Sequence, residues 1–285
     1  MKSLIGCLLL VLLQASLAVN AVATDMNSAD AEIILAYRTT EKLPFIAQAP
    51  DNRGLFEDMF REAAHRAGLR LKIERMPKAR ILNALINGDV DFYPQFTFDD
   101  ARNKYTFFAP NGLNVSYSAI SRPGIGRLDS AEHFNGLTLL HGVGNPDYLD
   151  KLGFGSARTK RFEVAEMDLA KAIMMIQKGR ADAYIYEAEP LEYALIKSGV
   201  TDVILHRELM SQAEPATLGF SRKSRLIALE PNPFYDGASP VSADNQPERL
   251  VAGSPLARLV GALDEMRRDG TIAALYRKYL GQEPQ

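Results

Sequence analysis

Short apolar, β-branched runs alternate with amphipathic stretches along most of this chain, and this order restricts its fold more than any other feature. EIILAYR at 32–38 and RLKIERM at 70–76 have the composition and alternation of strands. Between them, GLFEDMFREAAHRAGL at 54–69 stops at Gly68, which is a good helix-terminating residue. Five apolar residues of that segment share one helical face: Leu55, Met59, Phe60, Ala63 and Ala67. The pattern predicts an α/β fold with mostly parallel strands.

The same order recurs further along the chain. KARILNALINGDVDFYPQF predicts a helix that ends at Gly88 and a strand over 90–96. LTLLHGVG at 137–144 and TDVILH at 201–206 are predicted strands, and DLAKAIMMIQKGRADAYIYEAEP at 168–190 is a predicted helix, turn and strand. ALINGDVDFYPQF and MIQKGRADAYIYE each carry a glycine with an aspartate three residues on, which favours two similar lobes. The alternative is that such helix-glycine-strand junctions recur in any α/β protein.

The last quarter of the chain contains a segment of different composition. Residues 225–253 are rich in Pro, Asp, Asn and Ser, and we expect an irregular surface insertion there. Two helices are predicted after it, with Ser254 and Thr271 as their N-caps.

The first 23 residues have one basic residue, an apolar core at about 4–13 and small residues near the end. This is the pattern of a secretory signal peptide, with cleavage expected before Thr24. The apolar core is shorter than the about 20 residues that a membrane span needs. The alternative is a lipoprotein lipidated at Cys7. Either reading predicts export, and we expect a periplasmic protein.

Composition excludes several classes of function. Cys7 is the only cysteine, so the exported chain of about 262 residues (285 less 23) has no disulfide and depends on its core. Without Lys2, 32 basic residues face 35 acidic ones, a net charge of −3 that gives no reason to expect nucleic-acid binding. The four histidines lack metal-binding spacing, and no nucleophile or cofactor motif is present. We therefore expect no metal and no cofactor.

Several segments in order resemble the periplasmic solute-binding proteins of the polar amino-acid type, family 3, which serve ABC importers. The resemblance rests on LPF at 43–45, GLFEDMFREAAHRAGLRLKIERMP, ALINGDVDFYPQFTFDDARNKYTFFAP, GRADAYIYEAEP, LGFSRK and DEMRRDGTIAALYRKYLG. It implies a type II periplasmic binding protein fold, in which two α/β lobes are joined by two crossing strands. Lobe 1 would comprise 24–114 and 217–285, and lobe 2 would comprise 115–216.

The segment TFDDAR follows the third predicted strand, where an open α/β sheet binds its ligands. Thr97 is expected to cap a short helix whose first N–H groups face an anion, and Arg102 offers a planar fork for a carboxylate. The resemblance makes Thr97 and Arg102 ligand-carboxylate contacts and the Gln95 carbonyl an ammonium acceptor. Asp99 and Asp100 are expected to stabilise the first helical turn. The alternative for Arg102 is a surface residue paired with Asp99.

In lobe 2, the resemblance places Glu187 where the family carries an acid that contacts the ligand's α-ammonium. The alternative is an exposed carboxylate at a strand end. Gly144 stands where the family usually offers a Ser or Thr hydroxyl, so the backbone N–H of Gly144 or the amide of Asn145 would substitute.

Three further residues are assigned to the ligand crevice by the resemblance. Phe45 and Tyr93 are candidates for stacking on the ligand, with the core as the alternative for both. Lys42 stands where an aromatic residue is often found, which favours a ligand with an extra negative group.

Together these features predict a non-enzymatic periplasmic receptor, a monomer, that captures an amino acid or related carboxylate by hinge closure and delivers it to an ABC permease. One alternative is an enzyme on the same scaffold, similar to cyclohexadienyl dehydratases, with Glu187 as its acid. The other is a sensory subunit for a chemoreceptor or a sensor kinase.

Overall fold

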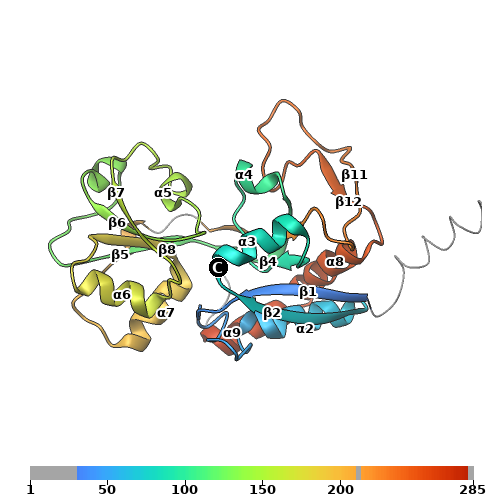
Figure 1. Ribbon diagram of the computed structural model, residues 1–285, viewed down its shortest axis with the longest axis horizontal. Coiled ribbons are helices and arrows are strands. Elements are labelled where there is room, and N and C mark those ends of the chain that lie inside the picture. The colour runs from blue at the N-terminus through green and yellow to red at the C-terminus, as the bar shows by residue number, and fades with distance from the viewer. Residues whose placement is uncertain (1–30, 210–212, 282–285) are drawn as a thin grey trace, which may run out of the picture.

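The computed structural model describes residues 31–209 and 213–281. The expected signal peptide at 1–23 and the alternative lipidation at Cys7 lie outside the described residues. Two five-stranded sheets, each flanked by helices, form two lobes (Figure 1). This confirms the expected two-lobed α/β fold.

The sheet of lobe 1 has the strand order β2-β1-β3-β10-β4. Strands β1, β2 and β3 are parallel, and β10 is antiparallel to both β3 and β4. The strand bounds are β1 Ala31–Arg38, β2 Leu69–Met76, β3 Phe92–Tyr93, β4 Thr106–Val115 and β10 Glu214–Ser221.

The sheet of lobe 2 has the order β7-β6-β8-β5-β9. Strands β6, β7 and β8 are parallel, whereas β5 is antiparallel to β8 and β9. The strand bounds are β5 Tyr117–Ser121, β6 Thr138–Gly142, β7 Lys160–Val164, β8 Ala183–Glu187 and β9 Ile204–His206. The chain enters this lobe after β4 and returns to lobe 1 through β10.

Helices cover both sheets. Their bounds are α2 Leu55–Arg66, α3 Lys78–Asn87, α4 Asp100–Asn103, α5 Tyr148–Lys151, α6 Leu169–Gln177, α7 Ala188–Ser198, α8 Pro255–Arg268 and α9 Thr271–Leu280, with 3-10 turns at Ala131–Phe134 and Arg207–Leu209. The amphipathic face of α2 packs into a series of phenylalanine rings in lobe 1, in which Phe60 lies 5.2 Å from Phe92 and Phe92 lies 5.9 Å from Phe220, centroid to centroid. These contacts anchor the helix on the sheet.

Several elements differ from the sequence-based expectation. The third strand was expected over 90–96 but comprises only Phe92–Tyr93, because Pro94 has no N–H with which to continue the ladder. Helix α7 was not predicted. Ser254 caps α8 as expected, accepting from the N–H of Ala257 at 3.4 Å. Thr271 is not an N-cap, because Gly270 occupies that position and Thr271 is the first helical residue.

The segment 225–253 is irregular in its middle but closed at its base. Strands β11 Leu229–Pro231 and β12 Glu248–Leu250 pair antiparallel as a separate two-stranded sheet. This segment projects from lobe 1 beside α4 (Figure 1).

Candidate functional site

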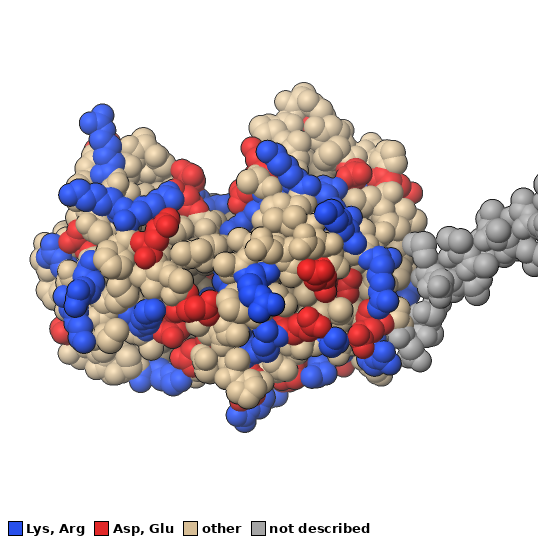
Figure 2. Space-filling view, in the orientation of Figure 1, with Lys and Arg blue, Asp and Glu red and all other residues tan. Residues whose placement is uncertain are grey.

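The carboxyl ends of four parallel strands point to the region between the lobes. In lobe 1, β1 ends at Arg38 and β3 ends at Tyr93. In lobe 2, β6 ends at Gly142 and β8 ends at Glu187. Hydrogen bonds and an ion pair cross between the lobes at these ends, and the surface is hollowed between the lobes at the upper edge of Figure 2. Ligands of open α/β sheets bind at such strand ends.

Arg102 lies on α4 and is buried, with 7% of its surface exposed. Its guanidinium donates to the backbone carbonyls of Thr97 at 2.9 Å and Gly144 at 3.1 Å, so it connects the two lobes. The guanidinium carbon also lies 4.3 Å from the ring centroid of Phe96. Arg102 does pair with Asp99, at 3.1 Å, but it is not the surface residue of the alternative interpretation.

The helix cap differs from the expectation. Asp99, not Thr97, is the N-cap of α4, because its carboxylate accepts from the N–H of Arg102 at 2.8 Å. Asp100 lies in the first turn, as expected. The expectation that Thr97 caps the helix was therefore wrong. Thr97 contacts Arg102 through its backbone carbonyl, and a ligand contact by its hydroxyl stays a prediction.

Lys42 of lobe 1 forms an ion pair with Glu187 of lobe 2. Both residues are buried, with 4% and 8% of their surfaces exposed. Lys42 Nζ also donates to Gln95 Oε1 at 2.8 Å. Glu187 is thus no exposed strand end. The Glu187 carboxylate, which was expected to contact a ligand's ammonium, contacts the ammonium of Lys42 in this structure. Lys42 also takes the side-chain oxygen of Gln95, and an ammonium contact of the Gln95 carbonyl stays a prediction.

Lys78, the first residue of α3, was not identified from the sequence. Its Nζ lies 3.6 Å from the ring centroid of Tyr93 and 5.4 Å from that of Phe96, the ring that Arg102 also covers. Burial, and after it the positive charges of Arg102, Arg38 and Lys42, lower the pKa of Lys78 well below its ordinary value. A nearby anion would stabilise the charged form of Lys78, which this environment disfavours.

Arg38 was also missed, although it is the one charged residue at the end of β1. It is buried and reaches across to lobe 2, where it donates to the Tyr186 hydroxyl at 3.1 Å and to the carbonyl of Met167. Its Nε donates to Thr40 Oγ1 at 2.7 Å. The signal that sequence reasoning overlooked is a basic side chain at a strand's carboxyl end.

The turn after β6 explains the glycine in the second lobe. Gly144 has a φ of +85°, and a Cβ there would lie 3.0 Å from Lys78 Cγ. A side chain at this position would thus be strained and would push against lobe 1. Asn145 closes the turn by donating its backbone N–H to the Gly142 carbonyl at 2.9 Å. Ligand binding by Gly144 or Asn145 stays a prediction.

The two aromatic candidates lie in the core. Phe45 packs on Phe56 with ring centroids 5.0 Å apart, and Tyr93 packs on Phe96 at 5.9 Å. Both residues are buried, yet each ring has a lysine ammonium next to it: Lys42 lies 5.4 Å from the Phe45 centroid and Lys78 lies over Tyr93. In this structure the two rings make cation–π contacts with the lysine ammonium groups.

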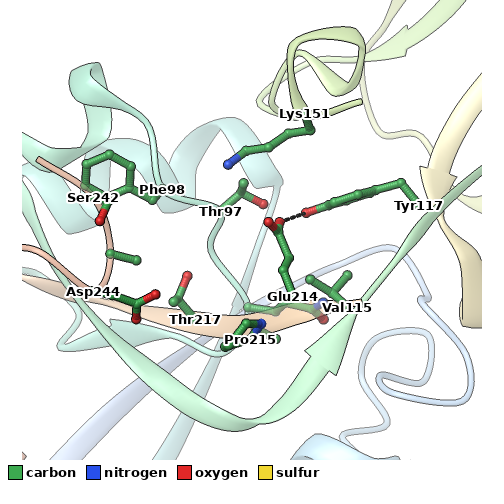
Figure 3. A pocket seen from close by; sticks show the side chains of 13 residues that line it. Thr97, Phe98, Val115, Tyr117, Lys151, Glu214, Pro215, Thr217, Ser242 and Asp244 are labelled. Carbon is green, nitrogen blue, oxygen red and sulfur yellow. Dashed lines mark hydrogen bonds between the residues drawn. The ribbon is translucent and has the colours of Figure 1, made fainter. Parts of the chain in front are cut away.

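A cavity of about 200 Å³ lies beside these charged residues, and Gln95 and Thr97 are part of its lining. It lies between β4, β10, α5 and the insertion (Figure 3). Lys151 of α5 reaches toward Thr97, and the Tyr117 hydroxyl donates to Glu214 at 3.4 Å. The insertion contributes part of the wall, and its lining residues are Ser242, Ala243 and Asp244.

The described residues contain neither a candidate metal site nor a membrane-spanning helix. In residues 31–209 and 213–281, no His, Cys, Asp and Glu side chains form a group of three or more that is able to hold a metal ion. Within the same ranges, no helix has the length and apolar character needed to cross a membrane.

Comparison with known proteins agrees with this architecture. The family model for bacterial extracellular solute-binding proteins, family 3, matches residues 34–282. A comparison with curated protein sequences finds no match.

Solved structures resemble the whole fold at low sequence identity. One concerns glutathione import via GshT and the cystine ABC importer TcyBC of Streptococcus mutans, with a TM-score of 0.67, 16% identity and coverage of 90% of this chain and 97% of that one. Another is the arginine-, lysine-, histidine-binding protein ArtJ from Geobacillus stearothermophilus, with a TM-score of 0.66, 16% identity and coverage of 89% and 97%. A histidine kinase sensor domain matches with a TM-score of 0.65, 17% identity and coverage of 90% and 99%.

Proposed function

We propose, on the premise that this chain belongs to family 3 of the bacterial extracellular solute-binding proteins, that it is a periplasmic receptor for a small polar ligand, an amino acid or a related carboxylate. The receptor captures its ligand without turnover by closure of the two lobes, and it acts as a monomer. The closed form delivers the ligand to an ABC permease, which recognises the geometry of the closed lobes.

One observation carries this proposal: charged side chains of both lobes meet at the strand ends. Arg102 of lobe 1 donates to Gly144 of lobe 2, and Lys42 of lobe 1 contacts Glu187 of lobe 2. A small ligand would receive charge-assisted hydrogen bonds on its carboxylate from Arg102 and Lys42 of lobe 1, and its remaining polar groups would meet Glu187 and the Gly144 turn of lobe 2 only when the lobes are closed. Such bonds contribute about 1.5–3 kcal/mol each, which is enough to shift an open-closed equilibrium.

The experiment exposes the purified protein to a mixed pool of amino acids and organic acids. After gel filtration, the protein is denatured, and any retained molecule is identified by mass spectrometry. We expect one unchanged molecule that raises the melting temperature and lowers the radius of gyration in small-angle X-ray scattering. Accumulation of a product would instead support the enzyme with Glu187 as its acid. No retained molecule and no change in shape would contradict the proposal.

The sensor-domain match keeps a second candidate, a ligand-binding subunit for a chemoreceptor or kinase. The fold does not distinguish it from transport, since the transport-related structures match about equally well. Uptake of the radiolabelled ligand by cells lacking the gene separates the two functions. We expect uptake to be lost on deletion and restored by the intact gene, whereas unchanged uptake would favour sensing.

A further inference from the structure

The strand ends between the lobes carry an excess of positive charge. Arg38, Lys42 and Arg102 all lie near Lys78, and each of their charges lowers its pKa. Shared aromatic rings link the same groups: Phe96 lies against Lys78 and Arg102, and Tyr186 lies near Lys42 and Arg38. Four cations are thus collected in one largely buried region.

Two carboxylates pair with this cluster by contact. Glu187 pairs with Lys42, and Asp99 pairs with Arg102. In the described part of the chain, Arg38 and Lys78 contact no carboxylate; their polar or aromatic neighbours are uncharged at neutral pH. Arg38 is buried, whereas Lys78 is partly exposed. An unpaired cation away from water is costly, so a bound anion would be favoured here, most of all beside Arg38.

Glu189 does not remove this excess. It is buried at the start of α7 and interacts with Glu187 and Lys42. Burial raises its pKa to about 7, so at neutral pH it is only partly ionised. The cluster therefore keeps a surplus of positive charge whichever form Glu189 takes.

The position of Lys42 decides which kind of anion fits. Its ammonium contacts the Glu187 carboxylate and donates to Gln95 Oε1, so the protein's own chain places a cation where a ligand ammonium would otherwise lie. The three surrounding rings, Phe45, Phe56 and Tyr186, lie 5.4, 5.9 and 5.8 Å from Lys42 Nζ. They hold the ammonium in place by cation–π contact. A ligand ammonium would have to displace it.

From this arrangement we infer that the ligand is a small organic acid with at least two negatively charged groups, and that an α-ammonium contributes nothing to its recognition. Lys78 and Arg102 receive one anionic group beside the Gly144 turn, and the second balances the charge that remains around Arg38 and Lys42. A zwitterion with no net charge leaves the surplus positive charge of the cluster uncompensated. This inference rests on the proposed receptor function and specifies the ligand class of the same site.

Matched ligands test the inference by isothermal titration calorimetry. Each four- to six-carbon dicarboxylate is compared with the amino acids of the same skeleton, for example glutarate with L-glutamate and L-glutamine. A phosphorylated carboxylate, 2-phosphoglycolate, shows whether a phosphate replaces one carboxylate. We expect at least one dianion to bind about tenfold or more tightly than its amino-acid counterparts. The amide counterpart lacks one charge-assisted hydrogen bond, and the ammonium of an acidic counterpart adds a positive charge to a cluster that already has an excess.

Two variants and one control locate the effect. Lys78→Met should weaken dianion binding about tenfold or more, because it removes an unpaired cation. Lys42→Met removes the cation that pairs with Glu187, so that this carboxylate can bind a ligand ammonium. The ratio of the affinity for the dianion to that for the matching amino acid should therefore fall. Lys72→Met is the control, since Lys72 is an exposed lysine of β2 paired with Glu74. Thermal melts show that each variant is folded.

The outcomes separate the inference from the proposed function. An amino acid or other zwitterion that binds as tightly as every dianion would overturn the inference, and lobe closure on that ligand would leave the receptor function standing. Dianion binding that Lys78→Met and Lys72→Met leave equally strong would also overturn it. Failure of the dianions and of the whole mixed pool to bind would contradict both.

Discussion

Arg102 shows how a single side chain serves both local structure and the site. Its backbone N–H is capped by Asp99, and its guanidinium lies against Phe96 while it donates to carbonyls of both lobes. Backbone carbonyls are weaker partners for a guanidinium than a carboxylate is, because only the carboxylate offers charge and a matched pair of oxygens. A ligand carboxylate that takes over these N–H groups would therefore bind favourably.

Removal of this guanidinium is expected to weaken ligand binding. Arg102→Ala should reduce the affinity for a carboxylate ligand by about 2 kcal/mol or more in calorimetry. Arg102→Lys should recover only part of the loss, because the ammonium lacks the planar fork. Arg61→Ala, on the exposed side of α2, is the control. Affinity unchanged in Arg102→Ala would show that this residue is not the anchor.

Glu189 gives the protein a pH dependence of its own. Burial raises the pKa of its carboxyl to about 7 in the folded protein, against an ordinary value of 4.5. Between these values the folded state binds more protons than the unfolded state, so its contribution to the free energy of unfolding falls as pH rises from 4.5 through 7. The pKa difference corresponds to a loss of about 3 kcal/mol.

Substitution by the neutral amide should remove this loss. Glu189→Gln is expected to be more stable than the parent at pH 8 and to differ little from it at pH 4.5, as measured by urea denaturation. Glu265→Gln on the exposed face of α8 should reproduce the parent curve at both values. A difference between parent and Glu189→Gln that does not change with pH would show that the carboxyl titrates normally.

At this scale, sequence reasoning found residue types better than partners. TFDDAR indicated a functional arginine after a strand, and Arg102 does lie between the lobes. The capping role went to Asp99 instead of Thr97, since both residues are good caps and the choice depends on the backbone path after Pro94. Lys78 and Arg38 were missed because their neighbours come from distant parts of the chain.

Among the elements, the insertion 225–253 is attached to β4 by the side chain of Gln246. Gln246 is buried, and its amide oxygen accepts from the N–H of Phe108 at 3.3 Å while its amide nitrogen donates to the Phe108 carbonyl at 2.8 Å. The side chain thus satisfies one residue of β4 as a neighbouring strand would. This contact holds the segment that forms one wall of the cavity beside Thr97 (Figure 3).

Truncation of this side chain should destabilise the protein. Gln246→Ala would leave both backbone groups of Phe108 without their partner in a buried position, which costs about 2 kcal/mol in the free energy of unfolding. Urea denaturation measures the change, and Ser239→Ala, an exposed serine of the same insertion, is the control. Stability equal to that of the control would mean that the insertion is not held by this contact.

Long periodic elements were predictable from sequence, whereas short and context-dependent ones were not. α2 and α3 follow from their apolar spacing and from the glycines after them. α7 follows β8 directly and carries Pro190 in its first turn, so the sequence 179–190 looked like a strand and its exit. The hairpin β11–β12 has strands of three residues, too short to show alternation.

For the whole molecule, the contacts between the lobes set the balance between open and closed forms. Arg38 donates to Tyr186 and Met167, Thr39 Oγ1 donates to Glu166 at 2.9 Å, and Arg102 donates to Gly144. Arg38 is the last residue of β1 and contacts two residues of lobe 2, whereas Arg102 lies on α4 and contacts one. The energy of these bonds is available only while the lobes touch, so it adds to closure and not to the stability of either lobe.

Loss of Arg38 is therefore expected to favour the open form. Charge-assisted hydrogen bonds contribute about 1.5–3 kcal/mol each, so Arg38→Met should shift the ligand-free equilibrium toward the open form about tenfold or more. Small-angle X-ray scattering should show a larger radius of gyration than in Arg70→Met, which alters an exposed arginine of β2. Saturating ligand should close both variants, at a higher concentration for Arg38→Met, because part of the binding energy goes into closure and because a charge that balances the ligand's second anionic group is lost. Equal radii without ligand would mean that Arg38 does not hold the lobes together.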